Sequence, residues 1–190
     1  MKQSRPGAFR GLAVVLLLAS GGLPACVAPA QLSLAEPGAR PQATPSGAPR
    51  VWLTEVIDQR QGSESLGQVA ARNFSSADLI PWLQNALLGL NSREFSLVRP
   101  DAEALPGPRL KVRLVKAYVD SVHASKIAVV VIETELSKPD LEQPLRKYYR
   151  GQCTHVNWAS GSGEVVSSLR VALADCLDKL GRDLGPSLNY

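Results

Sequence analysis

The sequence predicts an α+β domain, a two-layer sandwich in which two helices cover one face of a mainly antiparallel sheet of about five strands. Strand-like segments rich in β-branched residues fill the middle of the chain, whereas apolar residues recur at helical spacing in only two segments. The expected order of elements is β-α-β-β-β-β-α, and each layer needs the other to bury its apolar face. A length of 190 residues suits one such domain with attachments.

A polar segment separates the first strand from the first helix. VWLTEVI, residues 51–57, is β-branched and aromatic, which favours a buried strand. Residues 58–76 are polar and contain glycine, so we expect a long loop. Asp78 can cap the helix that follows, and Pro81 falls in its first turn, where a proline breaks no hydrogen bond. Gly89 and Asn91 are expected to end this helix. Its apolar positions are Trp82, Leu83, Ala86, Leu87 and Leu90.

Two long strands are expected to form a hairpin in the centre of the domain, after a short strand at residues 94–98. Residues 109–119 alternate between basic and apolar side chains until the alternation breaks at Val115, which indicates a β-bulge. Residues 120–126 close the hairpin, and the strongly apolar residues 127–136 form its second strand.

The chain is expected to end in a strand and a long helix. Residues 145–158 should pair next as the last strand of the sheet. Ser162 or Gly161 can cap the final helix, and Gly185 and Pro186 are expected to stop it. One face of this helix carries Val166, Leu169, Leu173, Leu177, Leu180 and Leu184.

The N-terminus is typical of a secretory signal peptide, which we place at residues 1–25. Residues 1–10 are cationic, GLAVVLLLAS follows as an apolar core, and GGLPA offers helix breakers and small residues to a peptidase. The apolar core is too short to span a membrane as a stable helix. Three of the 21 basic residues lie in this leader, which leaves 18 basic against 17 acidic side chains. Non-specific nucleic-acid binding requires a positive field, so we expect no nucleic-acid partner.

LPAC, residues 23–26, resembles the lipobox of bacterial lipoproteins, in which a small residue precedes a cysteine. The resemblance implies that the Cys26 thiol receives a diacylglycerol, that cleavage occurs before Cys26, and that the new amine takes a fatty acid such as palmitate. Several acyl chains anchor a protein durably, whereas ordinary cleavage near an incidental cysteine is the alternative. Val27 follows Cys26. An Asp at this position resembles the inner-membrane retention signal of enteric bacteria, so its absence favours the outer membrane.

Residues 26–49 are expected to hold the lipidated cysteine and a linker, and residues 50–190 the periplasmic domain. Five prolines spread among Ala, Ser and Gly leave no apolar period between Val27 and Arg50. These roughly 24 residues would span roughly 25–30 Å as a coil, and about 75 Å as polyproline II. We therefore expect a tether that holds the domain off a membrane surface and has no site of its own.

Several short motifs follow the signal peptide in order along the chain: DQR at 58–60, KAYVD at 116–120, KIAVVVIETEL at 126–136, RKYYRGQCTHVN at 146–157 and ALADCLDKLGRDL at 172–184. With these motifs the chain resembles the YajG-like family of small Gram-negative outer-membrane lipoproteins. The resemblance implies an α+β domain in the periplasm and a lipid anchor in the outer membrane. It carries over Cys26 as the lipid site and Asp58 and Arg60 as a recurrent turn; it carries over no catalytic residue, and Cys153 and Cys176 lie outside the pattern.

Cys153 and Cys176 remain once Cys26 carries lipid. They are expected on the last strand and on the inward flank of the last helix, where the oxidising periplasm allows a disulfide worth about 3 kcal/mol in the chain-entropy model. The alternative is two separate buried thiols. A catalytic thiol would need a base, and His155 shares the strand face of Cys153, but no third orienting group is evident.

Other polar residues admit a structural and a functional reading. Asp58 and Arg60 can form a turn at the loop entry or contribute to a ligand site. His123 and His155 are too few and too scattered for a metal site, and we expect no metal or cofactor. A basic strand face, either solvated or directed at lipid phosphates, is formed by Arg109, Lys111, Arg113 and Lys116.

The sequence contains no recognisable acid/base pair, triad or metal cluster, so we expect that the protein is not an enzyme. It predicts a lipoprotein anchored in the outer membrane and facing the periplasm, which acts as a non-catalytic binding or assembly module. The expected partner besides the membrane is an envelope protein or complex. The alternative is an auxiliary lipoprotein of an ABC-type lipid-transport system of the envelope, with lipid as its ligand.

Overall fold

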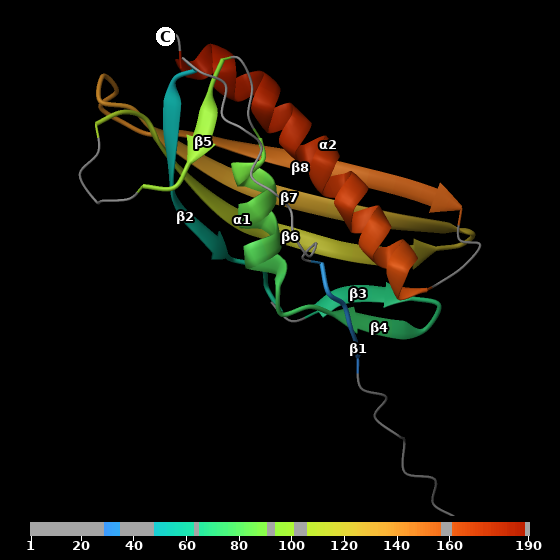
Figure 1. Ribbon diagram of the computed structural model, residues 1–190. Helices are drawn as coiled ribbons and strands as arrows, with labels where there is room; N and C mark the ends of the chain where they lie inside the picture. Colours follow the sequence, from blue (N-terminus) through green and yellow to red (C-terminus); the bar gives the residue numbers. More distant parts are fainter. Residues whose placement is uncertain are drawn as a thin grey trace, which may run out of the picture.

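A computed structural model describes residues 29–34, 48–62, 65–90, 94–100, 106–156 and 161–188. The predicted α+β class is confirmed, with two helices packed on a large sheet and a small sheet beside it (Figure 1). The large sheet has the strand order β5-β2-β6-β7-β8, and the small sheet has the order β1-β4-β3. The elements are β1 (Ala30–Gln31), β2 (Arg50–Asp58), β3 (Ser65–Val69), β4 (Arg72–Ser75), α1 (Leu79–Leu88), β5 (Ser96–Val98), β6 (Arg109–Val122), β7 (Ser125–Ser137), β8 (Leu145–Val156) and α2 (Ser162–Leu188).

The large sheet is mixed. Strands β6, β7 and β8 form two long antiparallel ladders, whereas β2 pairs in parallel with both β5 and β6 over shorter stretches. The predicted bulge is confirmed, because the β6–β7 register shifts between Leu114 and Lys116. The extra residue turns Ala117 and Val119 to the buried side that Leu114 already faces.

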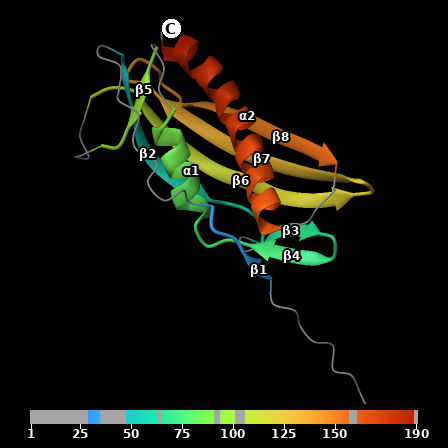
Figure 2. The ribbon, with the colours of Figure 1, turned by 45° about the vertical axis from the view of Figure 1, so that its right-hand side comes forward.

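Both helices cover the same face of the large sheet (Figure 2). Helix α2 packs on β8 and β7, and a glycine permits the contact: a Cβ on Gly151 would stand 2.5 Å from the amide nitrogen of Cys176. The helix was predicted to stop at Gly185 and Pro186, but it continues to Leu188. Leu184 and Gly185 are buried, so packing maintains the last turn although the proline removes one helical hydrogen bond.

The predicted loop at residues 58–76 is wrong in its second half, where β3 and β4 form a hairpin. Ala70 and Ala71 make the turn with φ values of 48° and 60°, a conformation for which glycine or asparagine is the usual signal. Leu66, Val69 and Phe74 are buried in the core, and their burial compensates for the unfavourable turn.

The predicted linker begins inside the fold. Ala30 and Gln31 pair in parallel with β4, and Leu32 and Leu34 are 5% and 0% exposed in the main core. Residues 30–34 are therefore part of the domain, and the boundary at residue 50 was set too late. The alternation of Leu32, Ser33 and Leu34 is a strand pattern that the surrounding prolines obscured.

Candidate functional site

Asp58 and Arg60 form a closed ion pair at the end of β2. The Asp58 carboxylate accepts hydrogen bonds from the Arg60 backbone N–H (3.1 Å) and from its Nε (3.0 Å) and Nη2 (2.8 Å). Arg60 Nη1 donates to the carbonyl oxygen of Ser65 at 3.2 Å, where β3 begins. The Arg60 side chain is only 5% exposed, so this fork holds a buried cation and fixes the chain between β2 and β3. The two residues thus form a closed turn, which is one of the two interpretations that the sequence left open for them.

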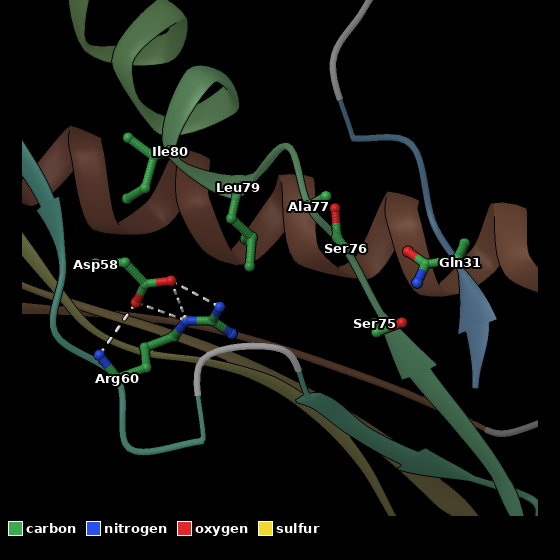
Figure 3. A pocket seen from close by; sticks show the side chains of 8 residues that line it. All are labelled: Gln31, Asp58, Arg60, Ser75, Ser76, Ala77, Leu79 and Ile80. Carbon is green, nitrogen blue, oxygen red and sulfur yellow. Dashed lines mark hydrogen bonds and ion pairs between the residues drawn. The ribbon is translucent and has the colours of Figure 1, made fainter. Parts of the chain in front are cut away.

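This ion pair forms one wall of a pocket of about 310 Å³ (Figure 3). The opposite wall comes from β1 and β4, which the sequence did not indicate as strands near this site. The hydroxyl of Ser75 is buried there without a hydrogen-bond partner in the described part of the chain. The lining residues are Gln31, Asp58, Arg60, Ser75, Ser76, Ala77, Leu79 and Ile80.

Asp78 fastens the N-terminal segment above this pocket. Its carboxylate accepts hydrogen bonds from the Leu34 amide (3.0 Å) and the Ser33 hydroxyl (3.3 Å), and from the Ser76 hydroxyl. Asp78 occupies the N-cap position of α1, but its side chain makes no cap hydrogen bond to the helix, so the predicted capping role is wrong. The tertiary contact with residues 33 and 34 takes the place of the local one.

A larger groove of about 910 Å³ lies between the β2–β3 connection and the second half of β6. Strand β3 approaches this half of β6 closely, since a Cβ on Gly67 would collide with the Val119 carbonyl. The groove has both polar and apolar walls, and it is lined by Gln59, Arg60, Gln61, Gly62, Ser65, Gly67, Gln68, Val115, Lys116, Ala117, Tyr118, Val119 and Asp120.

Cys153 and His155 on β8 lie near Lys126, a buried lysine on β7. Lys126 Nζ, on a side chain 3% exposed, forms an ion pair of 2.8 Å with Glu164, and both line a pocket of about 270 Å³ with His155. Burial raises the pKa of the Cys153 thiol, which the Lys126 charge offsets only in part. A thiol kept protonated is a poor nucleophile, so this arrangement favours a structural role.

The two described cysteines are free thiols, so the disulfide between Cys153 and Cys176 is absent from the structure. The Cys176 thiol donates to the carbonyl oxygen of Tyr149 at 3.4 Å, and that carbonyl lies four residues along β8 from Cys153. Four residues of a strand cover about 13 Å, so the Cys176 sulfur is turned away from its proposed partner. Burial raises the pKa of Cys176 to about 11.

The basic face of β6 meets acidic side chains. Arg113 lies 3.3 Å from both Glu133 and Glu135 on β7, and Lys111 lies 3.7 Å from Glu55 on β2. The strand register places these opposite charges side by side, which the sequence alone could not indicate. This neutralisation favours the solvated sheet face over a phosphate-binding surface.

Neither a metal site nor a membrane span is found in the described ranges. They contain no group of three or more His, Cys, Asp and Glu residues that could hold a metal ion. Within the same ranges, each helix is too short or too polar to cross a bilayer. The predicted leader and the lipid site Cys26 lie outside the described residues.

Comparisons with known proteins show no family for this chain. No family model matches the sequence, and no curated protein matches it. The chain is similar to the crystal structure of an uncharacterized protein, with a TM-score of 0.48, 15% identity, and coverage of 72% of this chain and 99% of that one.

Two further structures come from named bacteria. The hypothetical protein CT253 from Chlamydia trachomatis has a TM-score of 0.39 at 4% identity and covers 68% of this chain and 96% of its own. The match with a minor lipoprotein from Acinetobacter baumannii has a TM-score of 0.37 at 6% identity and covers 70% of this chain and 93% of that chain. Structural neighbours of this chain thus include a bacterial lipoprotein, but scores below 0.5 support no conclusion about its function.

Proposed function

We propose that this protein is an outer-membrane lipoprotein, anchored through Cys26, whose periplasmic domain is a non-catalytic binding or assembly module of the YajG-like type. The signal peptide and the lipobox at residues 23–26 support the anchor. Val27 after the cysteine favours the outer membrane.

The Asp58–Arg60 pair is the single observation that carries the non-catalytic part. It is the polar pair that the sequence offered as a ligand site, and three N–H groups of Arg60 donate hydrogen bonds to its carboxylate. A carboxylate bound in this way is neither a free general base nor an open ligand for a cation. Its effect is to hold the β2–β3 connection in one conformation, which suits a recognition surface.

The groove beside this connection is the surface that we assign to an envelope protein partner. Gln61 and Gln68 offer exposed amide groups, and Tyr118 and Val115 on β6 offer partly exposed apolar surface. A mixed surface of this kind is typical of non-obligate protein interfaces. The rigid Arg60 pair would limit the entropy lost on binding.

Site-specific crosslinking in the native envelope tests this assignment. A benzophenone amino acid at Gln61 should form a covalent adduct with one identifiable protein after irradiation. The same group at Asp178, whose side chain is 66% exposed on α2 away from the groove, is the control and should form none. Adducts from Asp178 alone, or the same set of adducts from both positions, would contradict a partner at the groove.

The anchor has a separate test. Metabolic labelling with a fatty-acid analogue should modify the wild-type protein and leave Cys26→Ala unmodified. Membrane fractionation then distinguishes the outer from the inner membrane. Equal labelling of the two proteins would rule out Cys26 as the lipid site, whatever the groove binds.

A further inference from the structure

We propose that the β3–β4 hairpin faces the lipid headgroups of the membrane that carries the anchor, so that the domain lies directly on the bilayer surface. This inference rests on the proposed lipid attachment at Cys26. It adds an orientation, a membrane-facing surface and the chemistry of what that surface meets.

The N-terminal segment is firmly attached to the fold. The Leu32 amide donates to the carbonyl oxygen of Ser75 at 2.8 Å, and the Leu34 amide donates to Asp78 at 3.0 Å. Arg170 on α2 donates to the carbonyl oxygen of Leu34 at 3.4 Å. With both leucines buried, releasing this segment would expose core surface and break these hydrogen bonds. Residue 30 is therefore a fixed point of the domain.

The chain between this fixed point and the proposed lipid is short. Only three residues separate Cys26 from Ala30. Four residue steps span at most about 14 Å when fully extended. The bilayer's hydrocarbon core alone is about 30 Å thick, so the anchored residue and β1 are close on this scale. The roughly 24-residue tether predicted from the prolines is not available between the lipid and the domain.

The chain enters the domain beside the turn of the β3–β4 hairpin. Strand β1 runs parallel to β4, with Ala30 opposite Phe74 and Gln31 opposite Ser75. The end of β1 nearest Cys26 is therefore also the end at which β4 leaves the hairpin turn, beside Arg72. Figure 1 shows the three strands of the small sheet together at one side of the molecule, below the helices. The hairpin turn is thus the part of the domain closest to the anchor.

The surface chemistry of this end suits phospholipid headgroups. Between Ser65 and Ala77 the chain contains one charged residue, Arg72, and residues 29–34 contain none. Arg72 is exposed, and its guanidinium lies 5.7 Å from the centre of the Phe74 ring. A single cation near the surface is attracted to lipid phosphates, and this stretch carries no carboxylate to be repelled. The other exposed residues at the hairpin turn are Ala70, Ala71 and Asn73, whereas Gln68 on β3 lines the neighbouring groove together with the exposed Asp120 of β6.

Fluorescence quenching in vesicles tests the orientation. The lipidated mature protein is reconstituted in vesicles of phosphatidylethanolamine and phosphatidylglycerol that contain a lipid with a nitroxide on its headgroup. A fluorophore is attached at Asn73→Cys or, as the matched control, at Asp140→Cys, since the native Cys153 and Cys176 are buried. Asp140 lies beyond the far end of β7. Ala128 on β7 pairs with Val119, which β3 approaches closely, and the strand from Ala128 to Ser137 spans about 30 Å. The control position is therefore far from the hairpin.

We expect the label at position 73 to be quenched several-fold more strongly than the label at position 140. Equal quenching, or stronger quenching at position 140, would overturn the proposed orientation. Insertion of a 15-residue Gly-Ser segment after Ala28 should lower the quenching at position 73 to the control level. Quenching that survives the insertion would overturn the short chain as its cause. Mass spectrometry and vesicle flotation separately report lipidation, so a protein without lipid refutes the anchor itself.

Discussion

The Asp175 carboxylate on helix α2 accepts a hydrogen bond of 3.0 Å from the backbone amide of Gln152 on strand β8. Lys179, one turn further along the helix, donates to the carbonyl oxygen of Arg150 at 2.8 Å and to Asp175 at 2.9 Å. Strand β8 is the last strand of the large sheet, so its outer backbone groups would otherwise face solvent or another chain. Two helix side chains therefore cover the centre of an edge strand.

Asp175→Asn should weaken this cover. The hydrogen bond to Lys179 and that to Gln152 lower the Asp175 pKa below its ordinary value. The charged carboxylate therefore contributes stability above the ordinary pKa, and the contribution is lost as the pH falls through the lowered one. We expect a loss of about 0.5–1 kcal/mol at pH 7 for this exposed pair, and a smaller difference from wild type in strong acid, both measured by urea unfolding. Asp178→Asn, which alters an ion pair with Arg182 alone, is the control and should change stability less.

Gly151→Ala should be strongly destabilising. An added methyl would overlap the carbonyl oxygen of Ala172 and lie 2.7 Å from the Cys176 Cβ, so α2 would have to move away from β8. Overpacking of this kind costs about 1–3 kcal/mol, and backbone contacts place this case at the upper end. Gly163→Ala is the control, because a Cβ at Gly163 would have no other atom within 4 Å. This variant should be neutral or stabilising in the same thermal unfolding assay. Equal melting temperatures for the two variants would contradict the close packing.

Leu34→Ala tests whether the N-terminal segment belongs to the fold. Its side chain is fully buried, so truncation should cost about 2–5 kcal/mol in urea unfolding. The same substitution at Leu141, which is 37% exposed in the β7–β8 turn, should change stability by much less. A Leu34 variant as stable as wild type would show that residues 30–34 do not contribute to the core, and it would remove the basis of the membrane orientation.

The two described cysteines should behave as unreactive free thiols. Burial raises the pKa of both, to about 11 for Cys176, so little thiolate is present at pH 8 and native alkylation should be slow. After denaturation without a reductant, both should alkylate rapidly, and mass spectrometry should count two modifications. If prior reduction is needed to obtain this count, the thiols are bridged and the free-thiol assignment is wrong.

The ion pair of Lys126 and Glu164 offers an asymmetric prediction. The lysine side chain is 3% exposed, whereas the glutamate is 47% exposed. Glu164→Gln leaves a buried cation with less compensation and should cost about 1–2 kcal/mol, below the 3–5 kcal/mol of a fully buried pair because the carboxylate is half-solvated. Lys126→Met removes the buried charge and should stay within about 1 kcal/mol of wild type. A larger loss for Lys126→Met, measured by chemical denaturation, would indicate that the ammonium group itself is required.

Strong periodicity made several elements predictable. Strand alternation in residues 109–119 indicated β6 and also its bulge, because a change of parity has only a few structural explanations. The apolar face of the last helix predicted most of α2, including the buried position of Cys176. In these segments the local pattern and the tertiary environment agree.

Weaker local signals failed where tertiary contacts override them. The Ala70–Ala71 turn contains neither Gly nor Asn, so the β3–β4 hairpin could not be predicted from turn chemistry. The path of the predicted linker was equally unpredictable, because the Leu32 amide bonds to Ser75 on β4 and the Leu34 carbonyl to Arg170 on α2. Of the candidate residues, Asp58 and Arg60 were singled out as the recurrent turn that the family resemblance implies, whereas the opposite wall of their pocket comes from distant strands.

The sequence by itself determined the α+β class and the strand and helix periods, because these depend on local composition and spacing. Its signals for export and lipid attachment lie outside the described residues and stay predictions. Tertiary structure alone decided that Glu133 and Glu135 pair with Arg113 on the basic face of β6, since this depends on strand register. It also decided that the Cys176 sulfur turns to Tyr149. Above all, it decided where the domain begins: Leu32 and Leu34 are buried in the core although the sequence predicted a linker there, because the free energy of the core outweighs the linker-like composition around them.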